Sequence, residues 1–196
     1  MHDIAAIILA AGASTRMGSP KQLLELQGKP LVVRACEAIS GAEIKDIIVV
    51  VGANAAQVSA ALALAKQPVR IVENPAWPEG MGASIRAGAA AIANDHNGAL
   101  IALCDQPRFS TEAVKKMLAA WNAAGGAPDV IVAARYAGRA GAPAIFGRNY
   151  FARLRALAGA EGAKHILSGN AQNLRLVDLP ELSLDVDTPE DWARAS

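Results

Sequence analysis

Residues 4–21 read Ile4-Ala5-Ala6-Ile7-Ile8-Leu9-Ala10-Ala11-Gly12-Ala13-Ser14-Thr15-Arg16-Met17-Gly18-Ser19-Pro20-Lys21. The apolar run from Ile4 to Leu9 is short and rich in isoleucine, which predicts a buried parallel strand. A loop follows, in which Gly12 and Gly18 remove side chains where the chain bends sharply or a ligand touches the backbone. Arg16 and Lys21 place two cations beside these amides, so the loop is suited to bind a polyphosphate.

The spacing of this loop excludes two common nucleotide-binding motifs. A P-loop has four residues between its glycines and a lysine directly after the second glycine. Here five residues separate Gly12 from Gly18, and Lys21 lies three positions further on. The dinucleotide fingerprint G-x-G-x-x-G is also absent from the sequence. The loop therefore belongs to a different class of phosphate-binding loop.

The size and composition of the chain favour one aliphatic domain. Its 196 residues are enough for a well-packed domain, and no linker, repeat or low-complexity tract divides them. We therefore expect residues 1–196 to form a single domain. Hydrophobic residues make up 53% of the chain and aromatic residues only 4%, as suits a parallel sheet packed between helices.

The charge balance excludes two classes of partner. Lysine and arginine number 19 and aspartate and glutamate 18, which argues against a nucleic-acid-binding or membrane-binding surface. No apolar run approaches the ~20 residues that span a bilayer. Cys36 and Cys104 are expected to be buried thiols, because no export signal precedes the first strand. We therefore expect a cytoplasmic protein.

Strands and helices are expected to alternate along the chain. Apolar strands are predicted at Ile47–Val51, Val69–Val72, Ala99–Leu103, Val130–Ala134 and Leu174–Val177, with an irregular β excursion at Tyr136–Phe146. Helices are predicted at Leu31–Ile39, Ala55–Ala65, Ser84–Ala93, after an N-cap at Ser110, at Asn149–Leu157, at Gly162–Leu167 and after a capping box of Thr188 and Asp191. This alternation predicts a three-layer α/β fold with a mainly parallel sheet, which binds ligands beyond the carboxyl ends of its strands.

Two aspartates follow apolar segments and are candidate metal ligands. Asp105 comes just after the strand that ends at Leu103, and Asp187 follows the segment around Val186. Carboxylates in such places are costly unless they are paired or hold a cation, so the two predict a Mg²⁺ site at one edge of the sheet. Two alternatives stay open. One is that Asp105 caps the next helix. The other is that Asp185 is the functional acid, or that Asp187 and Thr188 only cap the last helix.

The segment from Glu73 to Ser84 is a second candidate binding loop. It contains two prolines and two glycines, so it is expected to be ordered without a strand ladder. Gly80 and Gly82 allow close approach of the backbone. Ser84 either caps the following helix or forms a hydrogen bond with the edge of a base.

The sequence resembles a known family over nearly its whole length. The segment LAAGASTRMGSPKQLLELQGKPL, which begins at Leu9, resembles the opening signature of the MobA-like nucleotidyltransferases, and most of all that of the molybdenum cofactor cytidylyltransferases. The segment from Glu73 to Ser84 resembles the second block of the family, which lies against the base and the ribose of the nucleotide. The resemblance implies the Rossmann-like nucleotidyltransferase fold, also named the nucleotide-diphospho-sugar transferase fold.

The resemblance also implies a reaction and a set of residues. A phosphate-bearing acceptor attacks the α-phosphate of a nucleoside triphosphate, and pyrophosphate leaves. Asp105 in D-Q-P and Asp187 in D-x-D-T-P correspond to the Mg²⁺ ligands, and the catalytic residues are expected to be Lys21, Arg16 and Asp105. The nucleotide-binding residues are expected to be Leu9, Ala10, Ala11, Gly12, Arg16, Gly18, Lys21, Asn74, Gly82 and Ser84.

The identity of the substrates is also suggested by the resemblance. The Leu9–Gly12 form L-A-A-G resembles the CTP-using branch, whose acceptor is the molybdenum-bound molybdopterin phosphate and whose product serves molybdenum hydroxylases. The chain departs from many members of the family at two places. Ala142 stands where many members have a histidine, and residues 160–164 stand where they have the aspartate-containing block G-D-x-G-A-R. The alternatives are GTP as donor, a methylerythritol or sugar phosphate as acceptor, and a non-catalytic cofactor carrier that delivers to a molybdenum hydroxylase or its chaperone.

Overall fold

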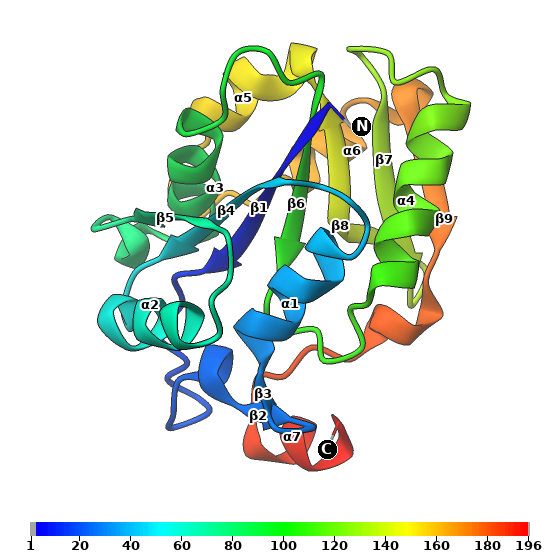
Figure 1. Cartoon of the computed structure of the whole chain (residues 1–196). Coiled ribbons are helices and arrows are strands. Elements are labelled where there is room, and N and C mark those ends of the chain that lie inside the picture. Colours follow the sequence, from blue (N-terminus) through cyan, green and yellow to red (C-terminus); the bar gives the residue numbers. More distant parts are fainter. Residues whose placement is uncertain (1–2, 196) are drawn as a thin grey trace.

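Seven strands form the central sheet of the computed structural model, which describes residues 3–195 (Figure 1). At its centre lie β1 (Ile4–Ala10), β4 (Asp46–Val51) and β6 (Gly98–Leu103), which are parallel and almost entirely buried. Their aliphatic side chains suit an extended chain that is covered on both faces. The predicted buried strand at Ile4–Leu9 is confirmed as β1.

The sheet is parallel except at one strand, β8 (Arg139–Gly147), which lies between β6 and β7 (Ile131–Tyr136). The order is β5-β4-β1-β6-β8-β7-β9. The other outer strands are β5 (Arg70–Glu73) and β9 (Leu174–Asp178). β8 runs antiparallel to both β6 and β7, and all other neighbours in this sheet are parallel. The mainly parallel sheet is therefore confirmed.

The irregular β excursion predicted at Tyr136–Phe146 is the β7–β8 hairpin. Its two-residue turn consists of Ala137 and Gly138, with φ of 48° and 73°. Positive φ at both central residues matches the right-handed twist of the flanking strands. Glycine at the second position adopts this conformation without strain.

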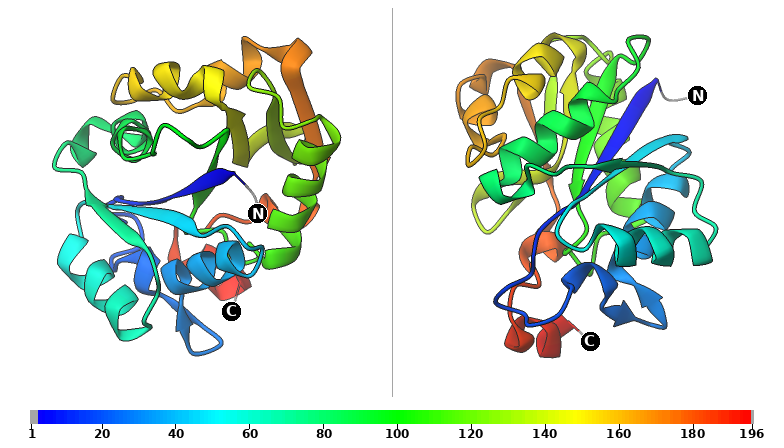
Figure 2. Two further views of the ribbon diagram at one scale, coloured as in Figure 1. Left: turned by 45° about the horizontal axis from the view of Figure 1, so that its top comes forward. Right: turned by 90° about the vertical axis from the view of Figure 1, so that its left-hand side faces the viewer.

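Helices cover both faces of the sheet, as the three-layer prediction requires (Figure 2). One face packs against α1 (Leu31–Ser40), α2 (Ala55–Leu64) and α4 (Thr111–Ala123). The other packs against α3 (Met81–Ala90), α5 (Phe151–Arg155) and α6 (Lys164–Ser168). Alternate residues of β1 enter the two cores, because successive side chains of a strand point to opposite faces. None of the helices in residues 3–195 has the length and apolar character to cross a membrane.

The ends of the helices confirm some predicted caps and correct others. The N-cap at Ser110 is confirmed, because Ala113 N donates to Ser110 Oγ at 3.3 Å. Asp105 therefore does not cap α4. The capping box before α7 (Pro189–Ala195) is also confirmed: Thr188 N donates to Asp191 Oδ2 at 2.9 Å, and Asp191 N donates to Thr188 Oγ1 at 3.2 Å.

Several short elements were not predicted. β2 (Glu25–Leu26) and β3 (Lys29–Pro30) form a small antiparallel ribbon, which is too short to show a periodic pattern. Turns of 3₁₀ helix occur at Lys21–Leu23, Trp77–Glu79, Arg148–Tyr150, Ala171–Asn173 and Pro180–Ser183. The ribbon, α7 and the loop after β1 lie at the same end of the molecule (Figures 1 and 2).

Candidate active site

The loop after β1 is held in shape by one buried amide side chain. Gln22 Nε2 donates to Ala10 O at 3.1 Å and to Gly12 O at 2.7 Å. Gln22 Oε1 accepts from Ser14 Oγ at 3.3 Å, and Ser14 Oγ in turn accepts from Lys21 N at 3.1 Å. Both ends of the loop are thus tied to one side chain. The sequence analysis missed Gln22, because a glutamine beside a lysine in a polar loop carries no signal of burial.

The same loop leaves backbone amides available for an anion. In the part of the chain that the structure describes, the N–H groups of residues 12–16 donate to no protein acceptor. A Cβ built at Gly12 would meet no atom within 4 Å, so the space beside it is open. Gly18 has a φ of +74°, a conformation that favours glycine. Unpaired amides around open space are suited to bind phosphate oxygens.

Four charged side chains from three segments of the chain meet beside this loop. Lys21 Nζ lies 2.5 Å from Asp105 Oδ2 and 2.9 Å from Asp187 Oδ1. Arg16 Nη2 lies 2.8 Å from Asp187 Oδ2. The structure therefore brings together the residues to which the sequence analysis assigned catalysis and metal binding.

The ion pairs of this cluster stabilise the charged forms of Lys21 and Asp187. The side chains of Lys21 and Asp105 are only 16% and 14% exposed, whereas that of Asp187 is 38% exposed. Burial alone would lower the pKa of Lys21, but Asp105 and then Asp187 outweigh it and raise this pKa. The hydrogen bond from Lys21, with further help from Arg16, lowers the pKa of Asp187. Asp105 Oδ1 is buried without a hydrogen-bond partner among the described residues, so one carboxylate oxygen remains free to bind a ligand.

Asp187 reaches the cluster from an irregular segment and not from the end of a strand. It does not follow a strand, because residues 184–187 form no regular element after the 3₁₀ turn at Pro180–Ser183. Val186 is fully buried, and its N–H donates to Asp105 O at 2.9 Å. Asp187 N donates to Asp191 Oδ2 at 3.2 Å, which leaves the Asp187 carboxylate free to contact Lys21 and Arg16.

The second predicted loop presents a serine hydroxyl. Asn74 is buried, and its Nδ2 donates to Ser84 Oγ at 3.1 Å while its Oδ1 accepts from Ala76 N at 3.1 Å. Ser84 is not a helix cap, because α3 begins three residues earlier, at Met81, with Gly80 as its N-cap. Since Ser84 Oγ already accepts a hydrogen bond from Asn74, its own hydroxyl hydrogen can be donated to a ligand.

Gly82 has a structural explanation that the sequence analysis did not foresee. A Cβ at Gly82 would lie 2.1 Å from Ala158 O and 2.4 Å from Glu161 O. Gly82 N also donates to Gly159 O at 2.8 Å. The glycine is needed where α3 meets residues 158–161, and it does not line the cavity described next.

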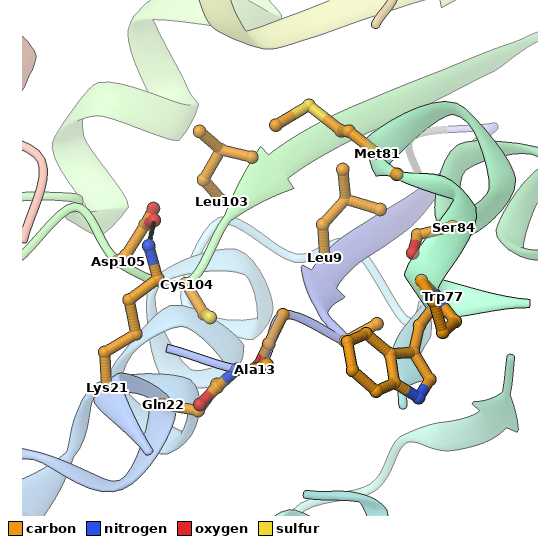
Figure 3. Close-up of a pocket in the computed structure, with 14 residues that line it drawn as sticks. Leu9, Ala13, Lys21, Gln22, Trp77, Met81, Ser84, Leu103, Cys104 and Asp105 are labelled. Carbon is orange, nitrogen blue, oxygen red and sulfur yellow. Dashed lines mark hydrogen bonds and ion pairs between the residues drawn. The ribbon is translucent and has the colours of Figure 1, made fainter. Parts of the chain in front are cut away.

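A cavity of about 340 Å³ lies between the two loops (Figure 3). Among the predicted site residues, those that line it are Leu9, Ala11, Gly12, Lys21, Ser84 and Asp105; those that do not are Ala10, Arg16, Gly18, Asn74, Gly82 and Asp187. Trp77 also lines it, and the sequence analysis gave this residue of the second loop no role. A lone large aromatic side chain between glycines and prolines is the sequence signal that could have singled out Trp77.

A larger cavity, of about 780 Å³, adjoins the first one. The two cavities share Leu9, Met81 and Leu103 as lining residues. The larger cavity is lined mainly by apolar side chains, and its charged lining residues are Arg139, Lys164 and Asp185. Its lining also includes the three residues that differ from the family pattern, Ala142, Ala160 and Lys164, together with Gly162 and Ala163 of the same block.

Buried polar contacts hold the wall between the larger cavity and the charged cluster. Tyr136 OH donates to Ala142 O at 2.9 Å and accepts from Gln106 Nε2 at 3.2 Å. Gln106 Nε2 also lies 3.4 Å from Leu182 O, at the start of the segment that carries Asp187. Gln106 therefore connects the cavity wall to the segment of Asp187. The D-Q-P motif gave this residue no role in the sequence analysis.

Comparison with family models identifies a match over most of the chain. Residues 6–176 match the model described as the MobA-like NTP transferase domain. A nicotine blue oxidoreductase from Paenarthrobacter nicotinovorans is 42% identical over 116 residues, which are 59% of this chain and 55% of that protein. The bifunctional protein GlmU of Mycolicibacterium gilvum is 34% identical over 129 residues, or 63% of this chain and 26% of that protein. The chain thus spans about half of the first relative and about a quarter of the second.

Solved structures with the same fold cover nearly the whole chain. Rv0371c from Mycobacterium tuberculosis has a TM-score of 0.83 and 28% sequence identity, with 98% of this chain and 97% of that chain covered. Another structure of that protein is a complex with manganese, with a TM-score of 0.75. A nucleotidyl transferase from Methanothermobacter thermautotroptrophicus has a TM-score of 0.81 at 23% identity, with 97% and 94% of the two chains covered, and so supports the fold.

Proposed function

This chain belongs to the MobA-like NTP transferase family, and from that premise we propose that it transfers CMP from CTP to a phosphate-bearing acceptor, with release of pyrophosphate. The acceptor that we propose is molybdenum-bound molybdopterin. The observation that carries the proposal is the contact of Lys21 with Asp105 and Asp187 beside a loop with free amides. Cations and metal-binding carboxylates at one point are what transfer at an α-phosphate requires.

The proposed reaction needs no protein nucleophile. A phosphate oxygen of the acceptor attacks the α-phosphorus of the nucleotide, and the bond from that phosphorus to the bridging oxygen of the β-phosphate breaks. Negative charge moves to the departing pyrophosphate. Lys21 and Arg16 would bind and stabilise this charge, and the free amides of residues 12–16 would orient the phosphates.

The residues present fit a divalent metal ion. Asp105 and Asp187 supply hard oxygen ligands, and Asp105 Oδ1 is buried without a protein partner among residues 3–195. The manganese complex of Rv0371c, which is 28% identical to this chain, also supports a metal-dependent site. When bound, Mg²⁺ would neutralise phosphate charge and polarise the phosphoryl group.

The smaller cavity supports a pyrimidine donor. Ala11 lines it and carries a methyl group that a glycine at this position would lack. A Cβ at Gly52 would lie 2.9 Å from Ala11 Cβ, so the Ala11 methyl group is confined against the neighbouring chain. A methyl-sized difference discriminates between ligands by about 1–3 kcal/mol, which favours CTP over GTP. Ser84 would donate its hydroxyl hydrogen to the edge of the base.

The larger cavity supports a bulky acceptor with an apolar body and an anionic group. Its apolar walls would leave the hydroxyl groups of a sugar or methylerythritol phosphate without hydrogen-bond partners, which is costly. Arg139 and Lys164 offer charges for the phosphate. These features favour a heterocyclic acceptor such as a pterin phosphate. A pure cofactor carrier would have little need for Lys21 between two carboxylates.

The decisive experiment is a substrate matrix with the purified full-length chain. Each of the four nucleoside triphosphates is tested with Mg²⁺ against molybdenum-bound molybdopterin, methylerythritol phosphate and sugar phosphates, with pyrophosphate release as the readout. We expect release with CTP and molybdopterin. Nicotine blue, with a nicotinamide dinucleotide supplied as reductant, is included because a relative is named for its oxidoreduction. Binding without turnover would support the carrier instead, and reduction of nicotine blue without pyrophosphate release would overturn the proposal.

A further inference from the structure

The ammonium group of Lys21 occupies the place between the two carboxylates to which a metal ion is assigned. It contacts one oxygen of Asp105 at 2.5 Å and one oxygen of Asp187 at 2.9 Å. Arg16 takes the other oxygen of Asp187. Of the four carboxylate oxygens, Asp105 Oδ1 is left without a partner among the described residues. A divalent ion that bridges Asp105 and Asp187 must therefore displace the Lys21 ammonium.

The charges of this cluster make displacement by a metal ion alone unfavourable. Arg16, Lys21, Asp105 and Asp187 sum to zero when all are ionised. A divalent cation that entered without an anion would sit beside two cations that had lost their partners, and like charges repel strongly at such distances in a partly buried site. A triphosphate changes this balance, because its oxygens accept hydrogen bonds from both Lys21 and Arg16.

The backbone around Lys21 stays anchored while its side chain is free to move. Lys21 N donates to Ser14 Oγ, and the neighbouring Gln22 is buried and bonded to Ala10 and Gly12. Only the four-carbon side chain of Lys21 has to swing from the carboxylates toward the open space beside Gly12. The loop therefore needs no rearrangement for the exchange.

We propose that the Lys21 ammonium group occupies the metal position in the free protein. A bound triphosphate attracts this group away from Asp105 and Asp187, and the metal ion can then bind. The inference rests on the proposed function in taking a nucleoside triphosphate as the ligand. It requires that the free protein binds divalent metal weakly and that nucleotide and metal strengthen each other's binding. The strengthening is equal in both directions, since coupling between two bound ligands is reciprocal.

The test is a titration of Mn²⁺ in the absence of nucleotide, followed by the EPR signal of the free ion. Lys21→Met keeps an unbranched side chain that is one atom shorter and removes its charge, whereas Lys21→Arg keeps a cation in place. Arg16→Gln is the matched control, because it removes one positive charge from the same cluster without emptying the place between the carboxylates. Asp105→Asn in the Lys21→Met background tests where the ion binds. Far-UV circular dichroism and thermal melting confirm that each variant is folded.

We expect Lys21→Met to bind Mn²⁺ at least about tenfold more tightly than the wild type. The affinity of Arg16→Gln for Mn²⁺ should rise about threefold or less, and that of Lys21→Arg should not rise. Asp105→Asn should remove the gain. Equal gains in Lys21→Met and Arg16→Gln would show a general charge effect and overturn the proposal, as would an Lys21→Met variant that binds no more tightly than the wild type.

A second titration with saturating CTP and no acceptor measures the coupling, after subtraction of the Mn²⁺ that the same CTP binds in the absence of protein. We expect CTP to tighten Mn²⁺ binding to the wild type at least about tenfold and to Lys21→Met about threefold or less. An equal effect on both proteins would overturn the exchange. If the protein binds no CTP, the proposed function fails, but the titrations without nucleotide still decide whether Lys21 occupies the metal position. The two failures are therefore distinguishable.

Discussion

Lys21 is the residue on which the proposed transfer depends most. The interaction energy of two unit charges about 4 Å apart is ~4 kcal/mol at an effective dielectric constant near 20. We therefore expect Lys21→Ala to lower kcat by ~10²- to 10³-fold. The measurement is steady-state pyrophosphate release. Lys29→Ala is the control, because Lys29 forms an exposed ion pair with Glu37 away from the cavity; near-normal turnover of Lys21→Ala would contradict the role.

Gln22 acts through the loop that it holds. Gln22→Ala would leave the carbonyl groups of Ala10 and Gly12 without their side-chain partner, and buried unpaired acceptors cost about 1–3 kcal/mol. We expect a loss of that size in the free energy of unfolding, measured with urea, together with a raised KM for the nucleotide. Gln172→Ala, at an exposed position, should change neither quantity. A raised KM without loss of stability would indicate direct contact of Gln22 with the nucleotide.

Trp77 offers a spectroscopic report on the smaller cavity. Its side chain, like that of Ser84, lines the cavity (Figure 3). Trp121 belongs to α4 and is buried in the core. A base that stacks on an indole ring quenches its emission, so we expect CTP to reduce the fluorescence of the wild type and Trp77→Phe to lose most of this change. Trp121→Phe should retain the change. An undiminished change in Trp77→Phe would place the base elsewhere.

At the scale of elements, the capping box before α7 links helix formation to the position of Asp187. The hydrogen bond from Thr188, with help from the backbone of Asp187 and from Arg194, lowers the pKa of Asp191. A lowered pKa in the folded state means that the stabilisation is present above the ordinary pKa of an aspartate and is lost as the pH falls through the lowered value.

We therefore expect the carboxyl carbon of Asp191 to titrate below its ordinary pKa in an NMR experiment. The amides of residues 190–195 should lose protection against hydrogen exchange, relative to their intrinsic exchange rates, once the pH falls below that value. Thr188→Ala should move the pKa of Asp191 back up toward its ordinary value, because it removes the first contributor. An unchanged pKa in that variant would show that Arg194 and the backbone lower the pKa of Asp191 without Thr188.

At the scale of the whole molecule, the two thiols report on the integrity of the core. Burial, followed by the neighbouring Glu37, raises the pKa of Cys36 to about 12. Burial, followed by Asp105, also raises the pKa of Cys104. The thiolate is the reactive form, so at pH 8 we expect neither cysteine to react with a disulfide reagent such as Ellman's reagent in the native protein and both to react in denaturant. Rapid reaction of Cys36 in the native state would show that this core opens, whereas rapid reaction of Cys104 alone would show access through the smaller cavity, which Cys104 lines.

The strand–helix alternation was predictable because it depends on local patterns. The isoleucine-rich run before Leu9 forms a strand wherever it is covered on both faces, and the caps at Ser110 and Thr188 depend on residues three positions away. Short crossover connections between the strands then favour a parallel sheet. In a parallel sheet the carboxyl ends of the strands lie at one edge, where ligands bind. The sequence by itself therefore determined the fold class and the segments that meet at one edge.

Only the tertiary structure decided which groups in those segments face each other. Gln22, Ser84 and Gly82 have roles set by distant partners: the ends of a folded loop, the amide of Asn74, and residues 158–161. Asp187 reaches Lys21 across 166 positions of sequence through a buried contact of Val186 with Asp105. Burial and close packing between such segments leave no periodic trace in the sequence, because they depend on the three-dimensional path of the chain and not on neighbouring residues.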